Sequence, residues 1–261
     1  INIPAMTIAG TITLAGNPRD PIISADSTQM YVSCGGSTVY RVNITTFVAT
    51  VFGAATPALV TAVNAFGERS NTRVYVTDVG AAIVPYFNTS GVFQGNFSTP
   101  GGASYGCADP TRDVIYISIG TNIYSYSSIT HTLLNTYTIG ASSLYNIQVT
   151  TDGNYLYAIS AASTSFYAIN LNTNVVTSYT TSSNPASPIS LSVRPDNKRL
   201  LIGGTGAGAY NIEGTTYTAY AVGKASQLGT TISGVGTFWT DQMIGGMIVF
   251  ADGTTSDIAD V

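Results

Sequence analysis

The chain of 261 residues can bury a sizeable core, and its 44% hydrophobic content excludes a disordered chain. Charged residues make up only 8%, against about 25% in ordinary globular chains. The net charge of −4, without a basic stripe, excludes a nucleic-acid-binding surface, and no apolar run approaches the length of a membrane span.

A short apolar strand recurs along the chain at a regular spacing. Four copies centre on Tyr and a fifth on Leu, at intervals of 44, 41, 41 and 44 residues, and a weaker sixth copy is Phe238-Trp239. A period of about 40–45 residues with four short strands in each copy is the signature of a β-propeller. The central residues are Tyr31, Tyr75, Tyr116, Tyr157 and Leu201.

Each copy predicts four strands. In the fourth copy an apolar run at 147–151 leads into the turn Asp152-Gly153-Asn154, whose residue types are typical of a hairpin. The Tyr-centred strand follows, and then come strands at 166–170 and 175–179. No stretch of 12 residues shows a helical period, so the chain is expected to be all-β.

These strands predict one β-propeller domain over 1–261 with six blades. The last blade lacks a fourth strand, and segment 10–18 matches the fourth-strand segment 49–57, so residues 8–16 are expected to complete that blade and close the ring. Residues 258–261 could begin that strand instead, and a seven-bladed or incomplete propeller is the alternative. The expected blades are 20–56, 57–100, 101–142, 143–184, 185–224 and 225–261.

The repeat unit resembles a known family. Segments 26–33, 39–43 and 45–50 look like the YVTN-type (WD40-like) β-propeller repeat, and segments 74–78 and 194–200 match it too. The resemblance implies a propeller of the kind found in surface-layer and other secreted proteins, and it carries no shared catalytic residue. The chain departs from the family's usual seven blades and from its charge content.

Two features resemble catalytic or phosphate-binding sites at first sight. The only histidine, His131, falls in a turn between third and fourth strands, where a solvent-exposed side chain is expected, and one histidine cannot build a triad. The glycine-rich run 203–208 lacks the following helix that a phosphate loop needs, so it is expected to form a hairpin. No catalytic residue and no cofactor is therefore predicted.

Carboxylates are the side chains of this sequence that could bind Ca²⁺. Asp78 and Asp241 end second strands and are weak candidates for an axial metal pair. Four others recur at the turn between first and second strands, where Asp ordinarily caps its own backbone, with a Ca²⁺ site at the rim as the alternative. These are Asp26, Asp109, Asp152 and Asp196.

Asparagine and cysteine complete the candidate sites. Sequons at Asn43, Asn88 and Asn96 are candidates for glycosylation in a secreted protein. Cys34 and Cys107 fall in blades that are not neighbours, so no disulfide is predicted.

The first functional hypothesis is a non-enzymatic propeller outside the cytoplasm, on a cell surface or a virion. It would serve as an adhesion, coat or decoration module, or as a receptor- or glycan-binding module, with a protein or glycan of a surface assembly as its partner. Homo-oligomers and particle lattices fit this hypothesis. The alternatives are a metal-dependent six-bladed lactonase or esterase and a scaffold domain of a larger surface protein.

Overall fold

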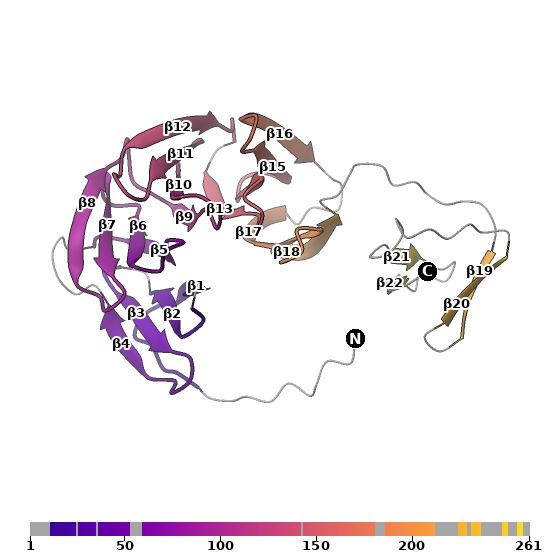
Figure 1. The fold of residues 1–261 in the computed structure, drawn as a ribbon, viewed down its shortest axis with the longest axis horizontal. Helices are drawn as coiled ribbons and strands as arrows, with labels where there is room; N and C mark the ends of the chain where they lie inside the picture. The colour runs from indigo at the N-terminus through magenta and orange to yellow at the C-terminus, as the bar shows by residue number, and fades with distance from the viewer. Residues whose placement is uncertain are drawn as a thin grey trace. The chain divides into compact units, whose positions relative to one another are not determined.

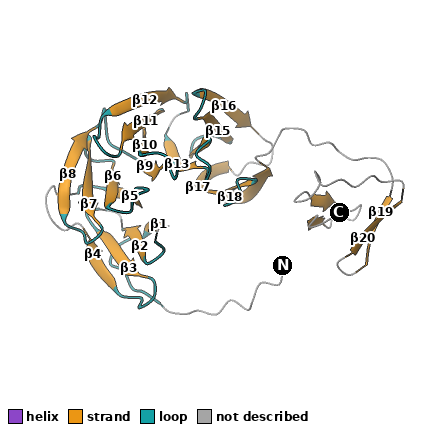
Figure 2. Cartoon of the chain, viewed as in Figure 1, coloured by secondary structure: helices purple, strands orange, loops and turns teal. Residues whose placement is uncertain are grey.

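The computed structural model describes the chain as two compact units, Ile1–Glu213 and Gly214–Val261, and each is treated by itself below. Every regular element in the described residues is a strand, as Figure 2 shows. Among these residues, no helix is long and apolar enough to cross a membrane. The described residues are 11–24, 26–34, 36–52, 59–141, 143–180, 186–211, 224–228, 231–235, 247–249 and 255–257.

Four antiparallel sheets of four strands each form most of the first unit. The first sheet contains β1 (Arg19–Ile23), β2 (Gln29–Ser33), β3 (Val39–Asn43) and β4 (Ala49–Phe52). The second contains β5 (Ala62–Gly67), β6 (Arg73–Asp78), β7 (Ile83–Asn88) and β8 (Phe93–Ser98). The third contains β9 (Tyr105–Ala108), β10 (Val114–Ile119), β11 (Asn122–Ser127) and β12 (Leu133–Thr138). The fourth contains β13 (Leu144–Val149), β14 (Tyr155–Ser160), β15 (Ser165–Asn170) and β16 (Val175–Thr180).

These sheets are arranged as blades of a β-propeller, with β1, β5, β9 and β13 on the inner side and β4, β8, β12 and β16 on the outer side (Figure 1). The all-β propeller prediction is confirmed for these four blades. The predicted central residues lie on the second strand of each blade and are buried: Tyr31, Tyr75, Tyr116 and Tyr157.

The core lies between neighbouring blades. Between the first and second blades, Tyr31 and Phe52 pack with Phe87, and the rings of Phe52 and Phe87 are 5.5 Å apart. A sheet that buries both faces needs apolar residues on both sides of each strand, which explains why the second strands are continuous apolar runs rather than alternating ones. Burial of both sheet faces therefore accounts for the core and for the recurring apolar strands that predict the propeller.

A fifth pair of strands follows in the same unit, β17 (Ala186–Val193) and β18 (Arg199–Asn211). The predicted hairpin at 203–208 is wrong, because β18 runs through this glycine-rich segment as one strand and Thr205 pairs with Ala186. β18 continues to Asn211, and residues 212–223, where the helix of a phosphate loop would begin, lie outside the described residues.

The predicted sixth blade, 225–261, falls in the second unit. Its described parts are two antiparallel pairs, β19 (Lys224–Leu228) with β20 (Thr231–Val235), and β21 (Met247–Val249) with β22 (Thr255–Asp257). The segment Phe238-Trp239 lies outside the described residues.

The N-terminal segment packs on the first blade. Of the predicted closing strand 8–16, the described residues 11–16 form no strand, but Ile12 and Leu14 contact the cluster of Val32, Cys34 and Val42. Val42 and Phe87 occupy equivalent positions, each one residue before the end of the third strand of its blade. Phe52 of the first blade packs on Phe87 of the second. Ile12 and Leu14 therefore cover the equivalent face of the first blade.

Candidate functional site

The turns between first and second strands, in the four blades and in the β17–β18 pair, hold most of the charged side chains of the described residues 11–211. In each turn a carboxylate accepts a hydrogen bond from the side chain two residues away. The donor comes first in Ser24–Asp26 (2.5 Å), Thr150–Asp152 (2.6 Å) and Arg194–Asp196 (2.7 Å). The carboxylate comes first in Glu68–Ser70 (2.7 Å) and Asp109–Thr111 (2.8 Å).

The recurring aspartates also cap their own turns, as the sequence predicts. Each accepts a hydrogen bond from the backbone N–H two residues further on, at 2.9–3.1 Å. Hydrogen bonds from Ser24 and Thr28 lower the pKa of Asp26, and the hydrogen bond from Arg194 lowers the pKa of Asp196 to about 2. In the second blade the Glu68 carboxylate instead accepts hydrogen bonds from the Ser70 and Thr72 hydroxyl groups. Its sequence signal is an acidic residue seven positions before Tyr75.

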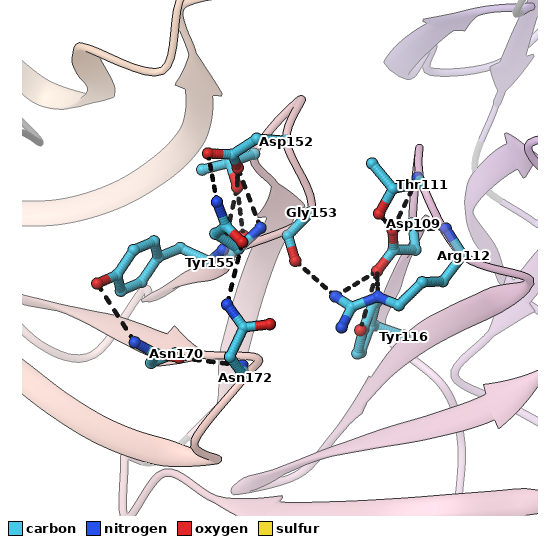
Figure 3. A network of polar contacts seen from close by, with 11 residues as sticks. Asp109, Thr111, Arg112, Tyr116, Asp152, Gly153, Tyr155, Asn170 and Asn172 are labelled. Carbon is cyan, nitrogen blue, oxygen red and sulfur yellow. Dashed lines mark hydrogen bonds and ion pairs between the residues drawn. The ribbon is translucent and has the colours of Figure 1, made fainter.

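Asp109 and Arg112 join the third blade to the fourth (Figure 3). The buried carboxylate of Asp109 forms an ion pair with Arg112 at 2.7 Å and accepts a hydrogen bond from the Tyr116 hydroxyl at 3.2 Å. The Arg112 guanidinium also donates to the carbonyl of Gly153 in the next blade at 2.5 Å. The carboxylate therefore orients a cation that links two blades.

The first-to-second strand turns of neighbouring blades contact one another, so they share one face of the propeller. Arg69 pairs with Asp113 at 3.3 Å, and Thr151 donates its backbone N–H to the Asn197 side chain at 2.8 Å. We call this the charged face. It is formed by residues 24, 26–28, 68–72, 109–113, 150–154 and 194–198.

The opposite ends of blades two to four form the uncharged face. Here inter-blade connections contact second-to-third strand turns, as in the hydrogen bonds from Val79 N–H to the Thr61 carbonyl at 3.2 Å and from Leu144 N–H to the Gly120 carbonyl at 3.3 Å. The residues are Gly, Ala, Ser, Thr, Val, Ile, Leu and Pro only, and Val60 and Val79 are exposed. They are 59–61, 79–82, 99–104, 120–121, 139–141 and 161–164.

Asp78 borders this face but is buried. Its carboxylate accepts backbone N–H groups of Val60 at 2.6 Å, Thr61 at 2.9 Å and Gly80 at 2.8 Å. The side chain therefore holds the connection into its own blade. The other weak metal candidate, Asp241, lies outside the described residues, among which no three His, Cys, Asp or Glu side chains gather as a metal site would require.

His131 is not the exposed turn residue that the sequence predicts. Its ring stacks on Tyr86, with centroids 4.3 Å apart, and on Phe97 at 5.2 Å, and Nε2 lies 3.1 Å from the Tyr75 hydroxyl. The turn that carries His131 folds over the preceding blade, which no local pattern reveals. Burial, with a further contribution from the positive charge of Arg73, lowers the pKa of His131.

The sequon asparagines of the outer turns cap those turns. The Asn43 side-chain oxygen accepts the backbone N–H groups of Thr45 and Thr46 at 2.9 and 2.8 Å, and Asn88 accepts those of Ser90 and Val92 at 3.0 and 2.9 Å. Both lie on the same side of the propeller as the charged turns.

The third sequon and the two cysteines lie within or next to strands. Asn96 is exposed on β8, opposite Pro85. Cys34 and Cys107 are both free thiols, and burial raises the pKa of each.

Comparisons with known proteins support the fold and add no activity. No protein-family model matches the chain, and no curated protein matches it. Among solved structures, the chain is similar to Kuenenia stuttgartiensis hydrazine synthase with a TM-score of 0.62 and 15% sequence identity, over 76% of this chain and 58% of that one. The chain thus spans less than two thirds of that structure, and at this identity the likeness shows the fold alone.

Proposed function

We propose that the chain is a non-enzymatic binding or coat module that works outside the cytoplasm, on a cell surface or a virion. The observation that carries the proposal is the uncharged face of blades two to four. Burying a charged group against a partner carries a desolvation penalty, and a face without charges avoids it. The cores of stable protein interfaces are depleted of charged residues in the same way.

The composition favours the same role. Val60 and Val79 expose 58% and 43% of their surface next to small hydroxyl and glycine residues, so a partner protein, a glycan or a second copy can cover this face closely. A surface rich in Ser, Thr, Asn and Tyr is solvated by hydrogen bonds and changes its charge little with pH. The resemblance to YVTN-type repeats supports a secreted location, and glycans at Asn43, Asn88 or Asn96 would accompany it.

The proposed module is a six-bladed ring. Ile12 and Leu14 support this idea, because they pack on the first blade as an outer strand of a preceding blade would. In this proposal residues 8–16 and 225–261 supply the sixth blade, and the ring presents its faces alone or as a scaffold domain of a larger surface protein.

Fractionation of the native source tests the function. The chain is expected in the envelope or particle fraction, and its recovery only as a free cytosolic monomer would refute the proposal. A variant with Val60→Lys and Val79→Lys places charges on the uncharged face and is expected to weaken that association. Ile129→Lys is the matched control, because Ile129 is 62% exposed in a turn on the charged side.

A further inference from the structure

The groove between the outer parts of the second and third blades is filled by rings. Tyr75, Tyr86 and Phe97 come from the second blade, and His131 comes from the third. His131 has a φ of 57°. Its N–H donates to the carbonyl of Ser127, the residue four positions earlier that begins the turn, at 2.9 Å. This backbone conformation aims the imidazole back over the second blade.

The same groove recurs between the third and fourth blades with smaller side chains. Tyr116 pairs with Ser125 across the sheet as Tyr75 pairs with Tyr86, so Ser125 stands where the second blade has Tyr86. Ser125 pairs with Asn135 of the fourth strand, and Tyr86 pairs with Gly95. Tyr137 and Phe97 each lie two residues beyond that partner, so Tyr137 stands where the second blade has Phe97.

Asn174 takes the place of His131. Its φ is 60°, and its N–H donates to the Asn170 carbonyl at 2.7 Å, four residues earlier. Two rings of the second-blade groove, Tyr86 and His131, are therefore replaced by the short side chains of Ser125 and Asn174.

A solvent-open cavity of about 380 Å³ lies where those rings would be, and its lining includes Arg112, Ser125, Leu134, Asn135, Tyr137 and Asn174. Its volume is at the low end of small-molecule sites, which span roughly 300–1,000 Å³, and suits one ring rather than a larger ligand. The other groove shows how a ring would lie, because His131 stacks on Phe97 with an interplanar angle of 7°.

The lining favours an uncharged polar ring. The positive charge of Arg112 is already paired with the buried Asp109, so the cavity offers no unpaired charge to an ionic ligand. The Asn135 amide donates to the Asn174 side-chain oxygen at 3.1 Å and its own oxygen accepts the Thr136 N–H at 2.8 Å, so the N–H groups that these bonds do not use are the ones offered to a ligand. Leu134 and Tyr137 supply apolar surface. Amides beside an apolar wall match a ring that has hydroxyl groups on its rim and C–H groups on its face.

We propose that this cavity binds one neutral pyranose ring of a glycan. The ring lies against Tyr137 and Leu134, and its hydroxyl groups bond to Asn135 and Asn174. This inference rests on the proposed function as a surface-binding module and names the ligand class of one of its sites.

The experiment titrates the full chain with methyl glycosides of glucose, galactose and mannose, with glucuronic acid as the charged comparison. The readout is the NMR signals of side-chain amides, where the NH₂ groups of Asn135 and Asn174 are expected to shift with at least one neutral glycoside. A double variant, Ser125→Tyr with Asn174→His, rebuilds the filled groove and is expected to weaken binding about tenfold or more.

A second variant tests the amide contact without filling the groove. Asn174→Gly tolerates the positive φ and removes one amide, and it should also weaken binding. Asn71→Gly is its matched control, because Asn71 also has a positive φ (53°) but lies in a turn of the second blade.

Three results would overturn the inference: no neutral glycoside shifts these signals, only glucuronic acid does, or the double variant binds the glycoside unchanged. Failure here leaves the fractionation result standing, because envelope association is measured without added sugar.

Discussion

The Tyr75 hydroxyl and the His131 imidazole lie 3.1 Å apart although 56 residues separate them in the chain. The same hydroxyl donates to the carbonyl of Ser128 at 3.1 Å, so one phenol holds both ends of a turn that belongs to the next blade. Its counterpart in the first blade, Tyr31, is fully buried, and its hydroxyl has no hydrogen-bond partner among the described residues.

This difference predicts opposite outcomes for one substitution at two equivalent sites. Tyr75→Phe removes a satisfied hydroxyl and is expected to lower the free energy of unfolding by about 1 kcal/mol. Tyr31→Phe removes an unsatisfied one and should leave stability unchanged or slightly higher. Urea unfolding at pH 7 measures both, and equal losses in the two variants would show that the Ser128 and His131 contacts contribute nothing.

His131 predicts a loss of stability in mild acid. Its pKa in the folded protein is lowered below the usual 6.5, so the unfolded chain binds the proton more tightly. The stabilising contribution of the neutral ring is therefore complete above pH 6.5 and declines as the pH falls below that value. Arg73 faces the ring and opposes its protonation, whereas Glu68 favours it.

The measurement is urea unfolding at intervals from pH 7.5 to 5. His131→Asn keeps a residue type that tolerates the positive φ and is expected to be less stable at pH 7, but with a flatter profile between pH 6.5 and 5. A variant whose profile parallels the wild type would assign the acid sensitivity to other groups.

Asp109 is expected to be the most costly carboxylate to neutralise in these turns. Asp109→Asn leaves the Arg112 guanidinium without its buried partner and should destabilise the protein by about 2–3 kcal/mol. Asp113→Asn breaks an exposed pair with Arg69 and should cost less than about 1 kcal/mol. Thermal or urea unfolding at low and high salt distinguishes the two ion pairs, because salt appreciably screens only the exposed Arg69–Asp113 pair.

Gly106 sets the spacing between the second and third blades. A Cβ atom at this position would overlap the ring of Phe66, which is buried in the shared core. Gly106→Ala is therefore expected to cost about 1–3 kcal/mol through overpacking. Gly67→Ala is the control, since its nearest contact would be an ordinary 3.8 Å to the Arg73 carbonyl, and a comparable loss there would argue against overpacking as the cause.

The blades were predictable because strand order and burial produce patterns that are local in the sequence. The Tyr-centred strands and the Asp-containing turns repeat at a fixed period, and each turn is held by hydrogen bonds within a few residues. The glycine-rich segment 203–208 misled the prediction because glycine accepts extended backbone as readily as a turn, and the long partner strand β17 decides the outcome.

The contacts between blades produce no local sequence pattern. The position of His131 over Tyr86 depends on how the third blade packs on the second. The cavity beside Ser125 and Asn174 likewise depends on how the third and fourth blades pack together. The sequence could therefore predict the repeating unit, whereas the sites that lie between units required the structure.

The turn pairs carry a consequence for how the repeats can diverge. Acid and donor exchange places between Ser24–Asp26 and Asp109–Thr111, yet the bridge between the two positions persists. Either order of acid and donor therefore makes the same contact, so in a turn such as Ser24–Asp26 we expect a reciprocal swap to be tolerated better than either single change. Duplicated blades can in this way lose visible likeness to one another while the scaffold they build stays the same.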